Sequence, residues 1–82
     1  MTIYVDEPLL DWRGKCWSHM VADTQLELHA FAEQLGLKRK WFQAHKTHPH
    51  YDITKSKFRL AKSLGAKVVT TQVLLKISHK MK

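Results

Sequence analysis

Residues 30–38, AFAEQLGLK, and residues 59–67, RLAKSLGAK, are similar, and in each a run of apolar residues at helical spacing ends in a glycine. A capping-box pattern begins at Thr24, ahead of the first stretch, and another threonine, Thr54, precedes the second. Glycine directly after such a run is typical of a helix C-terminus. The repeated pattern therefore predicts two helices, each of which begins after a threonine and ends at a glycine.

Short apolar segments and a third helical pattern surround these helices. We expect three strands, at Ile3–Val5, Trp41–Gln43 and Val68–Thr71, and a last helix with Val73, Leu74 and Ile77 on its apolar face. Residues 9–22 and 44–53 are polar or irregular and are expected to be loops. Alternation of strands and helices is typical of a parallel sheet with right-handed crossovers.

The predicted fold is therefore α/β, a small two-layer or three-layer domain with a short, mostly parallel three-stranded sheet and about three helices. A chain of 82 residues favours a single domain over residues 1–82. One cysteine, Cys16, excludes an intrachain disulfide, and no apolar run reaches the length of a membrane span. With no signal-peptide pattern at the N-terminus, we expect a cytoplasmic protein without membrane contact.

Charge is divided unevenly along the chain, whose formal net charge is +7. Residues 1–37 hold two basic and six acidic side chains, whereas residues 38–82 hold twelve basic side chains and one acid. This asymmetry favours an anionic partner, such as a nucleotide or nucleic acid, or a homodimer that pairs opposite halves. The alternative is that the lysines only solvate two helices.

Both predicted loops contain a histidine four residues before an aspartate, His19 to Asp23 and His48 to Asp52. In open parallel sheets ligands bind at the carboxyl ends of the strands. We expect both loops at that edge, together with the aspartate that follows the first strand. The candidate catalytic residues are Asp6, His19, His50 and Asp52.

The spacing of the segment His48-Pro-His50-Tyr-Asp52 suggests its chemistry. Alternate residues of an extended chain point to the same side, so its imidazoles and carboxylate are expected to project together. Such a set suits a metal ion or a His–Asp general base. It matches no strong metal signature, so metal and cofactor remain open at this point. His29 lies off the apolar face of the first helix and is expected to be exposed to solvent.

Four further residues are candidates for ligand binding. Trp12 and Trp17 suit stacking on a base, and Lys55 and Arg59 follow a helix N-terminus that favours phosphate. The alternative interpretation is that the tryptophans close the core and that the lysines form a solvated helix face. The chain has no P-loop pattern.

Two short motifs, Val5-Asp6-Glu7 and His50-Tyr51-Asp52-Ile53, resemble those of a family of short uncharacterised bacterial and phage proteins. That family is marked by Val-Asp-Asp and His-Tyr-Asp-Leu motifs, so Glu7 and Ile53 depart from it. Glu7 keeps a carboxylate on a longer arm, which puts a strict metal geometry at position 7 in doubt. The resemblance extends over nearly the whole chain and implies no reaction, but it suggests a phage or prophage setting.

Three functions compete on these grounds. The first is a small module that binds a nucleotide or nucleic-acid segment at the carboxyl edge of its sheet. The second is a metal-assisted or His–Asp phosphoesterase in the same pocket. The third is a phage-type interaction or inhibitor protein that binds an acidic surface of a host protein.

Overall fold

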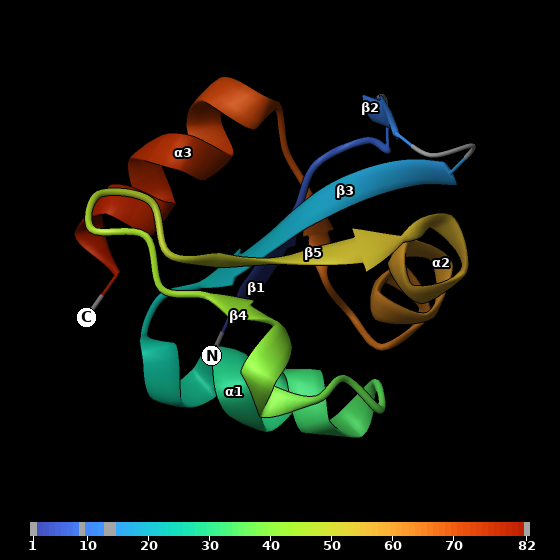
Figure 1. Ribbon diagram of the computed structural model, residues 1–82, viewed down its shortest axis with the longest axis horizontal. Helices are drawn as coiled ribbons and strands as arrows, with labels where there is room; N and C mark the ends of the chain where they lie inside the picture. Colours follow the sequence, from blue (N-terminus) through green and yellow to red (C-terminus); the bar gives the residue numbers. More distant parts are fainter. Residues whose placement is uncertain (1, 9, 13–14, 82) are drawn as a thin grey trace.

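The computed structural model describes residues 2–8, 10–12 and 15–81. The strands are β1 (Ile3–Val5), β2 (Leu10–Trp12), β3 (Lys15–Ala22), β4 (Phe42–Gln43), β5 (His50–Thr54) and β6 (Lys67–Val68). The helices are α1 (Gln25–Gln34), α2 (Lys55–Ser63) and α3 (Thr71–Lys80), with a 3₁₀ turn, η1 (Arg39–Trp41) (Figure 1). The expected α/β class and the three helices are confirmed.

The sheet differs from the predicted one. Its strands lie in the order β4-β5-β3-β1-β6, and β2 pairs with β3 beside the N-terminal half of that strand. Among the strand pairs of the described residues, β1–β6 alone is parallel. The prediction of a three-stranded, mostly parallel sheet was therefore wrong, because the central strand, β3, had been assigned to a loop.

The central strand, β3, could not be recognised from the sequence because some of its buried positions are polar. β3 has eight residues and falls within the predicted loop 9–22, and β5 falls largely within the predicted loop 44–53. Ser18 is 1 % exposed and donates a hydrogen bond to the Asp6 carbonyl, so a polar position faces the core. Polar residues on both faces of β3 remove the alternation by which a half-buried strand is usually recognised.

Of the three predicted strands, Ile3–Val5 agrees with β1, and the other two were predicted too long. The segment Trp41–Gln43 forms a strand only from Phe42, because Trp41 belongs to the turn η1. The segment Val68–Thr71 contributes only Val68 to β6, which begins one residue earlier, and its last residue opens α3. Both are two-residue edge strands, so few hydrogen bonds define them.

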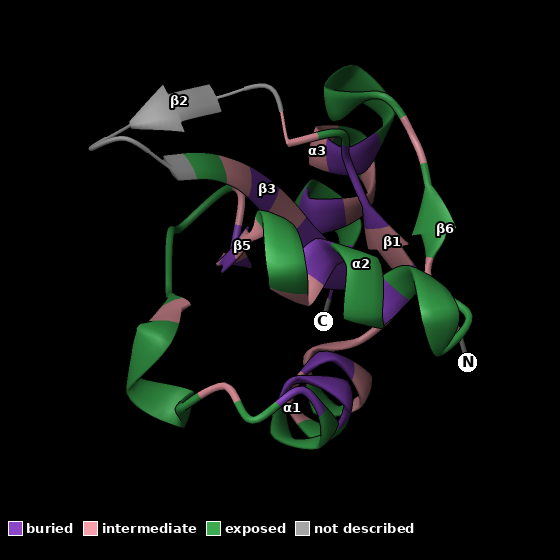
Figure 2. Ribbon diagram, turned by 90° about the vertical axis from the view of Figure 1, so that its right-hand side faces the viewer, coloured by how far each residue is buried: buried purple, intermediate pink, exposed green. Residues whose placement is uncertain are grey.

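Helices cover both faces of the sheet (Figures 1 and 2). The face that contains Met20, Tyr51 and Ile53, all at most 1 % exposed, packs against α1 and α2. The opposite face packs against α3, whose Leu74 is fully buried. The result is a three-layer arrangement with β3 at its centre.

The helix boundaries agree with the sequence pattern better than the helix faces do. Thr24 caps α1 by accepting a hydrogen bond from the Glu27 backbone N–H, and Gly36 after the helix has a φ of 78°, which favours glycine. The spacing of Phe58, Ala61 and Leu64 predicts one buried face of the second helix. Phe58 and Ala61 are buried, but Leu64, the residue directly after α2, is 48 % exposed. Val73, expected on the apolar face of α3, is 44 % exposed.

His29 was expected to be exposed, but it is partly buried. Its Nδ1 lies 2.8 Å from the Tyr51 hydroxyl, and its ring packs edge-on against Phe42. Burial, with a smaller effect of Arg39, holds the pKa of His29 below its usual value. The described residues include no helix of the length and apolarity that crossing a membrane requires.

Candidate functional site

Pairing of β3 with β5 brings two of the candidate residues together. His19 lies directly opposite Asp52 in the antiparallel register of these strands. Both residues are therefore inside strands, not in strand-to-helix loops, and the expected meeting of two loops at one carboxyl edge is wrong. The site lies on the face of the sheet that α3 partly covers.

Asp6 follows β1 directly and orients His19. One carboxylate oxygen, Oδ1, accepts the His19 backbone N–H at 2.6 Å and the Ser18 hydroxyl at 3.1 Å. The other, Oδ2, lies 2.7 Å from His19 Nδ1 and accepts the Thr71 hydroxyl at 2.8 Å. Burial favours the neutral acid, but the hydrogen bonds from His19 and Thr71 outweigh it and hold the pKa of Asp6 below its usual value.

His50 and Asp52 lie two residues apart on one face of β5, as their spacing predicted. His48, which was expected to project with them, precedes the strand, and its Nδ1 lies 2.8 Å from the Thr47 hydroxyl. His50 Nε2 is 3.2 Å from Asp52 Oδ1, and His50 Nδ1 is 2.6 Å from the His48 carbonyl. Burial opposes the charged imidazole, but the Asp52 carboxylate and the His48 carbonyl stabilise it, so the pKa of His50 is raised. The hydrogen bond from His50 lowers the pKa of Asp52.

Three side chains form a compact group of ligand atoms. One atom each of His19, His50 and Asp52 lies within 4.8 Å of the other two. His19 Nε2 is 3.9 Å from Asp52 Oδ1, and the two imidazole rings meet edge to face at 5.1 Å. We call His19, His50 and Asp52 the His–Asp cluster, and within the described part of the chain its ligand atoms are close enough to share one ion.

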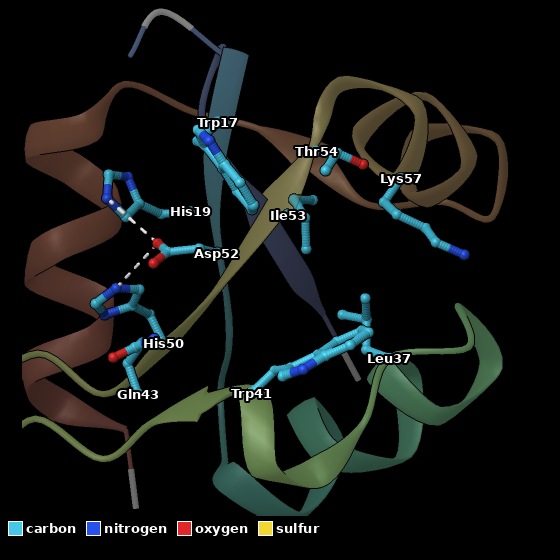
Figure 3. Close-up of a pocket in the computed structure, with 10 residues that line it drawn as sticks. All are labelled: Trp17, His19, Leu37, Trp41, Gln43, His50, Asp52, Ile53, Thr54 and Lys57. Carbon is cyan, nitrogen blue, oxygen red and sulfur yellow. Dashed lines mark ion pairs between the residues drawn. The ribbon is translucent and has the colours of Figure 1, made fainter. Parts of the chain in front are cut away.

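A groove of about 660 Å³ begins at this cluster and runs along β5 (Figure 3). Strand β4 pairs only with His50 and Tyr51, because the turn η1, which directly precedes β4 in the chain, does not continue along β5. The edge of β5 beyond Tyr51 is therefore open to the groove. The lining residues outside the His–Asp cluster are Trp17, Leu37, Trp41, Gln43, Ile53, Thr54 and Lys57.

Among the predicted ligand-binding residues, the structure places Trp17 in the groove. Lys55 and Arg59 are exposed on α2 and do not line it, whereas Lys57 between them does. Trp12 belongs to β2, and its side chain lies outside the part of the chain that the structure describes. The cations near the start of α2 therefore indicated the correct helix, but not which of its lysines lines the groove.

Sequence reasoning missed Trp41 and Thr71 as site residues. Trp41 is 46 % exposed on the groove wall, and the Lys38 ammonium lies 5.7 Å from its ring centre. Thr71 is 65 residues from Asp6 along the chain, so no local pattern connects them. Trp41 could have been found from the sequence, because it is a large aromatic residue directly after three cations, Lys38-Arg39-Lys40.

Helix α3 makes hydrogen bonds to the surroundings of the site at both of its ends. Near its N-terminus, Thr71 donates to Asp6, which in turn orients His19. Near its C-terminus, the buried Ser78 hydroxyl donates to the Pro49 carbonyl at 2.6 Å, next to His50. The positions of both histidines therefore depend on a helix that contributes no residue to the cluster itself.

A family model described as "Protein of unknown function (DUF4031)" matches residues 3–81. Neither the comparison with curated proteins nor that with solved structures gives a match.

Proposed function

The chain belongs to this family of unknown function, and we propose that it binds a nucleotide, with the base in the groove beside β5 and the phosphate at the start of α2. The observation that carries the proposal is the composition of the groove: two tryptophans, a mostly apolar lining and a cation at one end.

The tryptophans suit a planar ring. Trp17 and Trp41 come from opposite walls, and Ile53 lies between them (Figure 3). Bases stack on aromatic side chains with a contribution of about 1–3 kcal/mol per base. The groove also has the size of ordinary small-molecule sites, which are roughly 300–1,000 Å³.

The start of α2 suits the phosphate. Thr54 and Lys57 both line the groove, and Thr54 makes no side-chain capping bond to the helix. The first turn contains no acidic residue, so its N–H groups and positive dipole end favour an anion. The Lys57 ammonium donates to the Leu35 carbonyl at 2.6 Å and has two further N–H groups.

The test is calorimetric titration of the full chain with AMP, adenosine and inorganic phosphate in the presence of EDTA. We expect AMP to bind more tightly than adenosine or phosphate. Lys57→Met should weaken AMP binding, whereas Lys62→Met, which changes an exposed cation in the last turn of the same helix, should not. Trp41→Ala should weaken AMP and adenosine alike. Failure of AMP to bind at millimolar concentration, or equal effects of both lysine variants, would overturn the proposal.

Phosphoester hydrolysis is the second candidate, favoured by the Asp6–His19 pair. An imidazole oriented by a buried carboxylate at the end of a groove is the arrangement of a general base. This candidate requires AMP in the opposite orientation, with its phosphate beside His19. Water would attack phosphorus, the ester P–O bond would break, and AMP would yield adenosine and phosphate. Phosphate release from AMP, assayed in buffer with EDTA and separately in metal-supplemented buffer without EDTA, measures this activity directly.

A further inference from the structure

We propose that His19, His50 and Asp52 bind one divalent transition-metal ion of the zinc type, with an open coordination position facing the groove. The proposal goes beyond nucleotide binding, because the ion would bind in the absence of a nucleotide.

The hydrogen bonds of both histidines determine which ring nitrogen is available to a metal. His50 Nδ1 faces the His48 carbonyl, which can only accept, so this nitrogen carries the proton. His19 Nδ1 faces the Asp6 carboxylate and donates to it. In the neutral imidazoles both Nε2 atoms therefore hold lone pairs, and both lie on the side of Asp52.

The distances within the cluster fit a common ion. Zinc–ligand bonds of about 2.0–2.1 Å in a tetrahedral site place neighbouring ligand atoms roughly 3.3 Å apart. The Asp52 oxygen lies 3.2 Å from one Nε2 and 3.9 Å from the other, and the whole group lies within 4.8 Å. Small side-chain rotations are enough to close this set around an ion.

The surroundings of the cluster resemble the outer shell of a metal site. A ligating histidine usually donates its other ring N–H to a carboxylate or a backbone carbonyl, which orients the ring and raises its basicity. Here His19 has the carboxylate of Asp6, 2 % exposed and itself hydrogen-bonded by Ser18 and Thr71, and His50 has the carbonyl of His48. These contacts orient both rings before any ion arrives.

The donor set selects the class of metal. Two imidazoles and one carboxylate suit Zn²⁺, Fe²⁺ or Co²⁺, whereas Mg²⁺ and Ca²⁺ prefer oxygen ligands. The side chains of His19, His50 and Asp52 are 20 %, 18 % and 39 % exposed, respectively, so the cluster is open on the groove side. Three protein ligands with an open position are typical of catalytic zinc sites.

The test uses the untagged full chain after treatment with a chelator, titrated with Co²⁺ as a spectroscopic probe and with Zn²⁺ by calorimetry. We expect one Co²⁺ per chain, with visible absorption bands of a low-coordinate site, and displacement by Zn²⁺ but not by Mg²⁺. Asp52→Asn, at a half-exposed position, should keep the fold by circular dichroism. It should weaken binding by more than the roughly 10–100-fold typical of losing an outer-shell partner.

His50→Gln is the second ligand variant, and His45→Gln is the matched control. His45 is an exposed histidine of the loop that leads to β5, and it lies outside the cluster. We expect His50→Gln to lose Co²⁺ binding and His45→Gln to retain it. Absence of metal binding by the wild type, or wild-type affinity in folded Asp52→Asn, would overturn the proposal. Because these titrations contain no nucleotide, their result is independent of AMP binding.

Discussion

At the scale of single residues, polar groups are buried where their hydrogen-bond partners come from distant strands and helices. Asp6 is 2 % exposed and accepts hydrogen bonds from Ser18, His19 and Thr71. A buried carboxylate without such partners would be strongly destabilising. Its position therefore depends on all three partners at once, and its role is to hold the His19 ring.

His29 provides a pH-dependent prediction at the same scale. Its pKa is lowered in the folded state, so the unfolded chain binds more protons as the pH falls below about 6.5. The contribution of His29 to stability is complete above that pH and is lost as the pH falls towards the folded pKa. We expect the free energy of unfolding of His29→Gln, relative to wild type, to rise as the pH is lowered.

The measurement is urea denaturation of both proteins between about pH 8 and pH 5. The comparison with wild type is necessary because the raised pKa of His50 has the opposite effect in this range. A difference between the two proteins that does not change with pH would contradict the prediction.

At the scale of elements, α2 shows where the apolar pattern predicted burial correctly and where it did not. Phe58 is 5 % exposed, whereas Leu64, at the end of the same predicted face, is 48 % exposed. We expect Phe58→Ala to lower the free energy of unfolding by about 3–5 kcal/mol. Leu64→Ala should change it by roughly 0.5 kcal/mol or less.

Thermal unfolding followed by circular dichroism measures both effects. Similar melting temperatures for the two variants would mean that the end of α2 is packed as tightly as its middle. A melting temperature of Leu64→Ala close to that of wild type would confirm that the hydrophobic face of α2 ends before Leu64.

At the scale of the whole molecule, α3 connects the site to the C-terminal part of the chain. The Ser78 hydroxyl is fully buried and donates to the Pro49 carbonyl. Ser78→Ala leaves this carbonyl without its partner, so we expect a loss of about 1–3 kcal/mol in the free energy of unfolding. Ser63→Ala removes a similar but exposed bond, to the Leu60 carbonyl, and should cost roughly 0.5 kcal/mol or less.

Urea denaturation at a single pH compares these two serine variants. Equal losses in the free energy of unfolding would show that the contact between α3 and the segment before His50 contributes no more stability than a surface hydrogen bond. A larger loss for Ser78→Ala would show that α3 stabilises the segment that precedes β5.

The sequence by itself determined the features that depend on neighbours a few residues away. Thr24 and Gly36 delimit α1 because a cap and a left-handed glycine act within one helical turn. His50 and Asp52 share one side of their segment because alternate residues of an extended chain do so. These local rules sufficed for the three helices, for β1 and for two of the three residues of the His–Asp cluster.

Only the tertiary structure decided which segments meet. The register of β3 and β5 places His19 opposite Asp52, and Thr71 reaches Asp6 from 65 residues away. The groove exists because η1 does not continue along the edge of β5. Strand pairing and register depend on hydrogen bonds and packing between residues far apart in sequence, so no pattern within a single segment contains them.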